Sequence, residues 1–373
     1  MKTVNAPPDR ALARDFSNQD HVFAHPFDVL RAAIEENAFP AASVAITRGE
    51  KLIALKALGR LTYDPESPEV STDTVFDLAS VSKVVATTTM AMILYERGLL
   101  DLDASMIGIV PEFASEDVRR NKISLRMLLA HSSGLPAHEK LYLRTSNKQE
   151  LQQAALRVPL KAAPGTRAEY SDIGFITLGL ALERIAEDPL DLFCQREIFG
   201  PLGMSHTGFN PPSTLRSSIP PTADDRSFRK RVIQGEVYDE NASVMGGIAP
   251  HAGVFATAAD VAIFAHAMLA GGTPVLRAQT ITTASRRESS PPGTSRALGW
   301  DTPSAPSQSG KYFSPSSFGH LGYTGTSLWI DPQRQLSVTL LTNRTWPDCA
   351  SQTIKQIRPR FHDAVIEALE KTT

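Results

Sequence analysis

Cysteine is scarce in this sequence of 373 residues, which contains only Cys194 and Cys349. Two cysteines provide no disulfide framework and fit no zinc motif, so we expect two buried thiols. His206 and His266 likewise have no metal-ligand spacing to another candidate residue. The sequence therefore predicts no metal site.

Long apolar runs and an excess of one charge are also missing. No segment approaches the roughly 20 apolar residues of a membrane span, and the first residues, MKTVNAPPDRALARDF, contain no signal-peptide core. We therefore expect a cytoplasmic protein, or a periplasmic or secreted one if a leader was removed. Lys and Arg number 38 against 40 Asp and Glu, and this balance excludes the basic footprint of a dedicated nucleic-acid binder.

What is present is the composition of an ordinary globular protein. Hydrophobic residues make up 42% of the chain and charged residues 21%, which is typical of such proteins. At about 150 residues per domain, the length predicts two domains or one large domain with an insertion.

Strand patterns occur near both ends of the chain, and helical patterns dominate between them. ASVAITRG and KLIALKALG, joined at Gly49-Glu50, predict a hairpin, and residues 324–331 and 335–342 predict two further strands. The helical patterns lie at 25–39, 80–100, 123–130, 174–186, 189–198, 258–270 and 351–370.

This order predicts an α+β fold, in which an antiparallel sheet flanked by helices carries an inserted all-helical domain. The expected parts of the chain are a loose lead-in (1–24), a discontinuous sheet domain (25–100 and 319–373) and a mainly helical domain (101–318). Proline, serine and glycine are dense at 209–228 and 285–318, so we expect long loops at 209–240 and 285–318 that carry substrate specificity.

Ser80 and Lys83 stand in the segment DLASVSK, where strand-like sequence gives way to a helix. Backbone N–H groups at a helix N-terminus lack helical partners and can stabilise an oxyanion. A lysine three residues on lies over the same face, and the flanking valines desolvate its ammonium, which lowers its pKa towards that of a usable base. The alternative from this segment alone is a serine that caps the helix and a solvated lysine.

Tyr170 precedes Ser171, Asp172 and an apolar helix. A tyrosine at this place can lie near a nucleophile and share a proton with a lysine, because a cationic Lys83 favours the phenolate. The alternative is a half-buried tyrosine with a hydrogen-bonded hydroxyl, and Asp172 as a helix cap.

His320, Gly322 and Tyr323 lie in a glycine-rich segment, GHLGYTGTS, that leads into a strand. Glycines in a strand allow a ligand to approach the backbone closely, so this edge can supply an oxyanion N–H from Tyr323. His320 can act as a neutral donor, a base or a cation. The alternative is a bulged edge strand with a surface histidine.

In this order, Ser80-x-x-Lys83, Tyr170-Ser171-Asp172 and His320-x-Gly322 resemble the three motifs of the serine β-lactamase-like superfamily. The most similar members are the class C β-lactamases, the low-molecular-mass penicillin-binding proteins and the family VIII-type esterases. Supporting segments are LLAHSSGLP (128–136), PLGM (201–204), DENA (239–242) and HAGVF (251–255). The resemblance covers about residues 25–370, nearly the whole chain.

The resemblance implies a site at the junction of the sheet and the helical domain. Ser80 would be the acylated nucleophile, Lys83 the group that activates it and Tyr170 the proton shuttle. The N–H groups of Ser80 and Tyr323 would form the oxyanion hole. No metal or organic cofactor is implied, and the expected partner is a small-molecule or peptide substrate.

Asp172, His320 and Gly322 are the residues that we expect to contact the substrate, and two of them depart from the β-lactamases. His320 stands where β-lactamases have lysine, and histidine is mostly neutral at pH 7. Asp172 stands where they have asparagine, and an ionised aspartate can only accept hydrogen bonds. Both changes weaken recognition of an anionic β-lactam and leave acyl transfer intact.

Two activities agree with this pattern, a carboxylesterase and a peptidase of the D-amino-acid type. The carboxypeptidase-like segments favour a peptide, whereas a histidine in place of a fixed cation fits an uncharged ester. The alternatives are a β-lactamase and a catalytically idle module that binds a ligand or assembles, although an idle copy need not retain the catalytic side chains. No feature argues for an interface, so the oligomeric state stays open.

Four other places in the sequence also have an expected role. We expect His131 to belong to a structural turn and His251 to close a loop near the helical domain. Trp300 is a candidate for lining the acyl pocket, and Asn343-Arg344 for fixing the end of the sheet.

Overall fold

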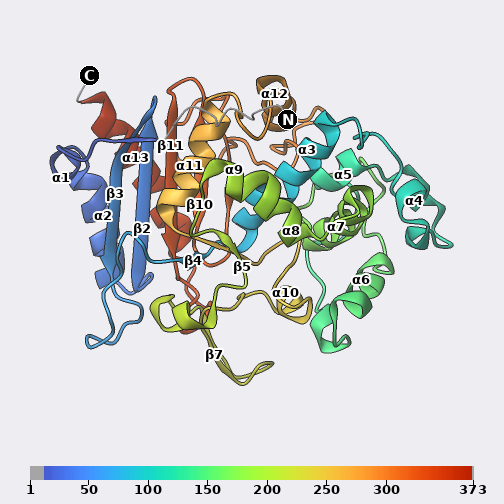
Figure 1. The fold of residues 1–373 in the computed structure, drawn as a ribbon, viewed down its shortest axis with the longest axis horizontal. Helices are drawn as coiled ribbons and strands as arrows, with labels where there is room; N and C mark the ends of the chain where they lie inside the picture. The colour runs from blue at the N-terminus through green and yellow to red at the C-terminus, as the bar shows by residue number, and fades with distance from the viewer. Residues whose placement is uncertain (1–11, 372–373) are drawn as a thin grey trace, which may run out of the picture.

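The computed structural model describes residues 12–371, and its centre is a six-stranded sheet with the order β1-β3-β2-β11-β10-β9. The strands are β1 (Ala13–Arg14), β2 (Ala41–Arg48), β3 (Lys51–Gly59), β9 (Phe318–Leu321), β10 (Ser327–Asp331) and β11 (Leu336–Thr342). β2 pairs with β11 in antiparallel register, so the two ends of the chain share one sheet (Figure 1). The predicted sheet from both ends of the chain is confirmed, and its strands are antiparallel except for the short β1, which pairs with β3 in parallel.

Helices cover both faces of this sheet. α2 (Ala24–Glu35) and α13 (Ile354–Glu370) pack together on one face, and α11 (Ala258–Leu269) packs on the other (Figure 1). The side chains of β2 alternate between these two layers: Val44 and Ile46 join the cluster of α2 and α13, whereas Ala45 joins the larger core that includes α11. The predicted flanking helices are confirmed, and the division into two domains stays a prediction.

Helices dominate the middle of the chain. They are α3 (Thr89–Glu96), α4 (Met106–Ile109), α5 (Leu125–Leu129), α6 (Lys148–Leu156), α7 (Asp172–Ala186), α8 (Leu190–Cys194), α9 (Gly200–Leu202), α10 (Glu240–Val244) and α12 (Ala278–Ser285). The predicted helix at 80–100 has three parts, since a 3-10 turn (Ala79–Val81) and a π-helical segment (Lys83–Thr88) precede α3. Short π-helical segments are frequent at functional sites.

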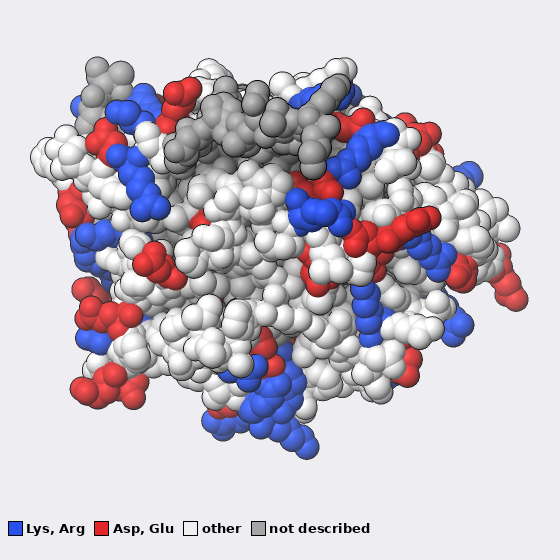
Figure 2. Space-filling view, in the orientation of Figure 1, with Lys and Arg blue, Asp and Glu red and all other residues white. Residues whose placement is uncertain are grey.

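The structure corrects the expected long loop at 209–240. This segment contains a short helical turn (Ser213–Ser218) and an antiparallel hairpin of β6 (Ala223–Asp225) and β7 (Arg231–Ile233). The many proline and serine residues predicted a loop. The hairpin was missed because each of its strands is only three residues long, which is too short to show an alternating pattern. The hairpin protrudes from the body of the molecule, and Lys and Arg side chains gather over it at the lower edge of Figure 2.

Three smaller differences concern the strands. β10 begins at Ser327, not at residue 324, because residues 322–326 form a turn. β4 (Phe76–Asp77), β8 (Val254–Ala256) and β5 (Gly208–Phe209) form a second sheet that the sequence did not predict. Part of the expected loose lead-in is ordered, because β1 pairs with β3, while residues 1–11 lie outside the described residues.

No helix within residues 12–371 combines the length and the apolar character needed to cross a membrane.

Candidate active site

Ser80 lies directly after β4, where the small sheet meets the helical part of the chain. The preceding residue, Ala79, has a φ of 47°, which costs a non-glycine residue on the order of 1 kcal/mol. Three contacts hold this strained turn: Asp77 accepts the N–H of Ala79 (2.8 Å) and of Tyr238 (2.7 Å), and its own carbonyl accepts from Thr324 (2.9 Å). The turn therefore presents Ser80 in one fixed orientation.

Lys83 is completely buried one turn after Ser80. Its Nζ donates to Ser80 Oγ (3.2 Å), Asp172 Oδ1 (2.6 Å) and the carbonyl of His251 (2.8 Å). These three acceptors match the three hydrogens of an ammonium and offset the cost of burying its charge. Burial lowers the pKa of Lys83, and the nearby charge of Asp172 opposes this shift.

Tyr170 lies two residues before α7, with its hydroxyl directed at Ser80. Its Oη is 2.7 Å from Ser80 Oγ and 3.0 Å from Asp172 Oδ1. Burial, reinforced by the charge of Asp172, raises the pKa of Tyr170 well above its usual value, so the phenol is protonated in the resting site. The side chain of Ser171 caps α7 by accepting from Gly174 N (2.9 Å), and this cap fixes where Tyr170 stands.

His131 belongs to a turn that supports Tyr170. Its Nδ1 accepts the N–H of Ser171 (3.0 Å), and its ring lies 4.8 Å from the ring of Tyr170. The imidazole thus packs behind the tyrosine and does not contact Ser80 through any hydrogen bond among the described residues. This matches the structural turn expected at His131.

The turn after β9 is hydrogen-bonded to the segment 77–80, which carries Ser80. Thr326 Oγ1 donates to the carbonyl of Leu78 (2.9 Å), and a Cβ at Gly322 would lie 2.6 Å from that same carbonyl oxygen. Only glycine permits this approach. Within residues 12–371, the backbone N–H groups of Ser80 and Tyr323 donate to no acceptor, as expected for N–H groups that await an oxyanion.

His320 is buried beside Tyr170, and the two ring centroids are 6.1 Å apart. Its Nδ1 lies 2.8 Å from the carbonyl of Leu321, so Nδ1 carries the proton and donates. Burial, together with the positive charge of Lys83, lowers the pKa of His320 well below its usual value. His320 is therefore a neutral imidazole at pH 7, not a substitute for a fixed cation.

Trp300 and Arg344 have clear places. Trp300 is buried against Phe318 (4.9 Å), stacks on Phe264 (6.4 Å) and lines a small cavity with Thr88 and Met92, and its place in an acyl pocket stays a prediction. Arg344 donates to the carbonyl of Tyr323 (2.7 Å), and its guanidinium lies 4.4 Å from the Tyr323 ring. The expectation that Arg344 fixes the sheet end agrees with these contacts.

Sequence reasoning assigned no individual role to three residues near the site. Asp77 orders the nucleophile turn, and burial raises its pKa to about 6; an aspartate that accepts from the backbone two residues on is a known turn signal. Asp239 Oδ1 lies 2.8 Å from His251 Nε2 and so orients the loop whose carbonyl holds Lys83. Arg296 lies 5.7 Å from the Tyr170 ring, and no local signal marks it because it comes from the segment 286–317.

His138, Asp172 and Asp239 are the candidate ligands for a cation. One ligand atom from each lies within 4.8 Å of the other two. Asp172 already pairs with the Lys83 ammonium, and Asp239 with His251. The carboxylates thus have partners within the protein, and we assign no metal to them.

Comparisons with known proteins identify the family of this chain. The family model described as Beta-lactamase matches residues 27–358. An Escherichia coli K12 protein named "Putative D-alanyl-D-alanine carboxypeptidase" and a Bacillus subtilis protein named "N-acetylmuramyl-L-alanine amidase" are each 30% identical over 346 residues. The alignments cover 82% of this chain, and 79% and 77% of the two relatives.

Among solved structures, "EstCE1, a hydrolase with promiscuous acyltransferase activity" superposes with a TM-score of 0.76. It is 23% identical, and the match covers 94% of this chain and all of that one, so it supports the fold alone. The resemblance seen in the motifs is confirmed. The chain belongs to the Beta-lactamase family and is a hydrolase of the serine β-lactamase and penicillin-binding-protein type.

Proposed function

We propose that this protein hydrolyses amides of peptide type, as a D-amino-acid peptidase or a related amidase, through an acyl-enzyme on Ser80. The contacts of Ser80 with both Lys83 and Tyr170 carry the proposal, since a nucleophile needs a base and a proton donor within hydrogen-bond reach. The names of the two relatives at 30% identity favour a peptide amide bond as the target.

In the proposed reaction, Ser80 Oγ forms a bond to the carbonyl carbon while its proton moves to Lys83 Nζ. This step requires a neutral Lys83, which burial favours and Asp172 opposes. The developing oxyanion accepts from the N–H groups of Ser80 and Tyr323. The C–N bond then breaks, and the leaving amine takes a proton through Tyr170; water repeats the sequence and releases the acid.

The site is poorly suited to anionic β-lactams. A neutral His320 cannot pair with the carboxylate of a β-lactam as a fixed lysine does. The same reason disfavours a peptide whose leaving group ends in a free carboxylate, so the peptide amides that fit best have none. Asp172 Oδ1 is also occupied by Lys83 and Tyr170, so it is not free to act as an asparagine amide does. The neutral imidazole favours an uncharged ester at least as well as a peptide, which makes a carboxylesterase the second candidate.

The decisive test compares the wild type with Ser80→Ala on p-nitrophenyl butyrate and on the C-terminal amide of an N-acylated D-alanyl-D-alanine peptide. We expect Ser80→Ala to lower kcat/KM by about 10⁴-fold or more on either substrate that the wild type accepts. Ser115→Ala changes an exposed serine and serves as the control. The ratio of the two wild-type values separates peptidase from esterase.

Two outcomes would contradict the proposal. Equal rates for wild type and Ser80→Ala would mean that Ser80 is not the nucleophile. A wild type that accepts neither substrate would favour the ligand-binding module instead.

A further inference from the structure

Arg358 of α13 is a buried cation that contacts the turn after β9. Its Nη2 donates to the carbonyls of Gly322 (2.6 Å) and Thr326 (2.9 Å), and its Nε donates to the carbonyl of Gly325 (3.3 Å). Across residues 12–371 it forms no ion pair. Burial, together with the charge of Arg344, lowers the pKa of Arg358 to about 9, so the guanidinium stays charged at pH 7.

The charge of Arg358 is therefore not cancelled by a carboxylate. Burying a charge is costly, and here three backbone carbonyls compensate for part of that cost. Arg344 is a second cation at this turn, since it donates to the carbonyl of Tyr323 (2.7 Å) and also forms no ion pair among the described residues. Positive charge fixed in advance is what a developing oxyanion requires.

The carbonyl of Gly322 and the N–H of Tyr323 belong to one peptide group. This peptide bond is trans, and in a planar trans peptide the C=O and the N–H point in opposite directions. Arg358 therefore fixes the direction of the N–H when it holds the C=O. A charged partner on the carbonyl also polarises the peptide group, which makes its N–H a stronger donor.

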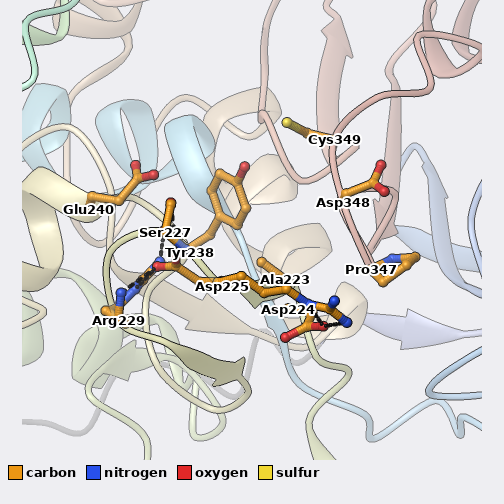
Figure 3. Close-up of a pocket in the computed structure, with 11 residues that line it drawn as sticks. Ala223, Asp224, Asp225, Ser227, Arg229, Tyr238, Glu240, Pro347, Asp348 and Cys349 are labelled. Atoms are coloured by element: carbon orange, nitrogen blue, oxygen red, sulfur yellow. Dashed lines mark hydrogen bonds and ion pairs between the residues drawn. The ribbon is translucent and has the colours of Figure 1, made fainter.

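The side chain of Tyr323 has different surroundings from its N–H. It is exposed, and its ring packs against the ring of Tyr238 with centroids 5.6 Å apart. Figure 3 shows Tyr238 in the pocket that it lines with residues 347–349. The hydrogen bonds of Arg358 go only to the backbone of the turn, so a change at Arg358 leaves both tyrosine side chains in place.

We propose that Arg358 is a positioning residue for the oxyanion hole. Through the carbonyl of Gly322, it aims the N–H of Tyr323 at the oxyanion and strengthens this N–H as a donor. The proposal rests on the proposed hydrolase function and adds to it a residue that lies outside the three motifs.

Arg358→Gln removes the charge and keeps an N–H donor. We expect kcat/KM on p-nitrophenyl butyrate to fall by about 10–100-fold, which is less than the loss of an oxyanion donor itself. Arg358→Lys keeps the charge without the planar fork and should recover part of the rate. If Arg358→Gln fails to fold, Arg358→Lys takes its place in the measurements below.

A thiono ester separates this role from a merely structural one. O-(4-Nitrophenyl) thiobutanoate has sulfur in place of the carbonyl oxygen, and sulfur is a weak hydrogen-bond acceptor. The wild type should therefore prefer the oxygen ester, and Arg358→Gln should lower the ratio of the two kcat/KM values by about tenfold. An equal fall on both esters would overturn the proposal, because a structural defect does not distinguish oxygen from sulfur.

Arg120→Gln is the matched control. Arg120 is also buried and donates to three backbone carbonyls, those of Phe113, Leu156 and Val158. This variant should lose stability in denaturant unfolding yet keep the ratio of the two esters. A ratio that falls as far in Arg120→Gln as in Arg358→Gln would also overturn the proposal.

Amide NMR of Ser80→Ala provides a readout that does not depend on turnover. Arg358→Gln in this background should shift the ¹⁵N and ¹H resonances of the Tyr323 amide, whereas Arg120→Gln should leave them in place. Unshifted resonances would overturn the proposal even if no ester is hydrolysed. Equal turnover by the wild type and Ser80→Ala would instead contradict the hydrolase function, so the two failures are distinguishable.

Discussion

The catalytic cluster and the turn after β9 each contact a buried cation, and they differ in what surrounds it. In the cluster, Lys83 faces the carboxylate of Asp172 at 2.6 Å. At the turn, Arg358 donates only to carbonyls and has no ion-pair partner among the described residues. A buried lysine can give up and regain a proton, whereas a guanidinium stays charged. The structure thus separates the groups that we propose to move protons from those that we propose to stabilise charge.

The comparison predicts that removing one hydroxyl from the cluster has a large effect. Tyr170→Phe deletes the group 2.7 Å from Ser80 Oγ and should lower kcat by about 10²–10⁴-fold, the usual contribution of a proton-transfer residue. Steady-state kinetics on p-nitrophenyl butyrate measure this fall in kcat. Tyr95→Phe, at an exposed position on α3, is the control and should retain full activity. Equal activities of the two variants would remove Tyr170 from the reaction.

Gly322→Ala tests the fastening between β9 and the nucleophile. The new Cβ would lie 1.9 Å from Thr326 Oγ1 and 2.6 Å from the carbonyl oxygen of Leu78. We expect a loss of about 1–3 kcal/mol in the free energy of unfolding, as for other overpacked sites, together with a fall in kcat.

Denaturant unfolding and kinetics check this prediction. Gly108→Ala is its control, because a Cβ at Gly108 would meet nothing within 4 Å. If Gly322→Ala unfolds and reacts like that control, the turn is not fastened as described.

Asp172→Asn should have the smallest effect on rate, because it changes a charge and keeps the shape. Asp172 raises the pKa of Lys83 against the larger lowering by burial. Without this carboxylate the pKa of Lys83 falls further, so more of the lysine is neutral at low pH. The acidic limb of the kcat/KM profile should therefore move to lower pH.

Rate measurements from pH 5 to 9 on wild type and Asp172→Asn check the shift. Asp224→Asn removes a carboxylate that pairs with the exposed Arg226, and this control should leave the limb in place. An unchanged limb in Asp172→Asn would mean that Lys83 is not the group titrating there.

The motifs predicted much of the site because local sequence dictates part of its geometry. Lys83 lies one turn after Ser80. Ser171, the residue after Tyr170, caps α7 by accepting the N–H of Gly174. The place of His320 and Gly322 also follows from the glycine-rich strand edge that the sequence contains. The short β6–β7 hairpin was missed because its three-residue strands give almost no alternating pattern.

Other features have no local signal. Asp77 contacts Tyr238 and Thr324 from segments more than 150 residues away, and Trp300 reaches the core by packing on Phe318 and Phe264. Periodicity describes only the neighbours of a residue along the chain, so it says nothing about such contacts.

The sequence by itself indicated the family, the sheet built from both ends of the chain and the three side chains that we propose to react. The sheet follows from periodicity and order along the chain, whereas the family and the proposed side chains follow from the resemblance of the three motifs. Only the tertiary structure decided that Asp172 faces Lys83, that His320 is neutral, and that Arg358 contacts the turn after β9. Charge state and pairing depend on burial and on which distant segments meet, and these arise only when the chain has folded.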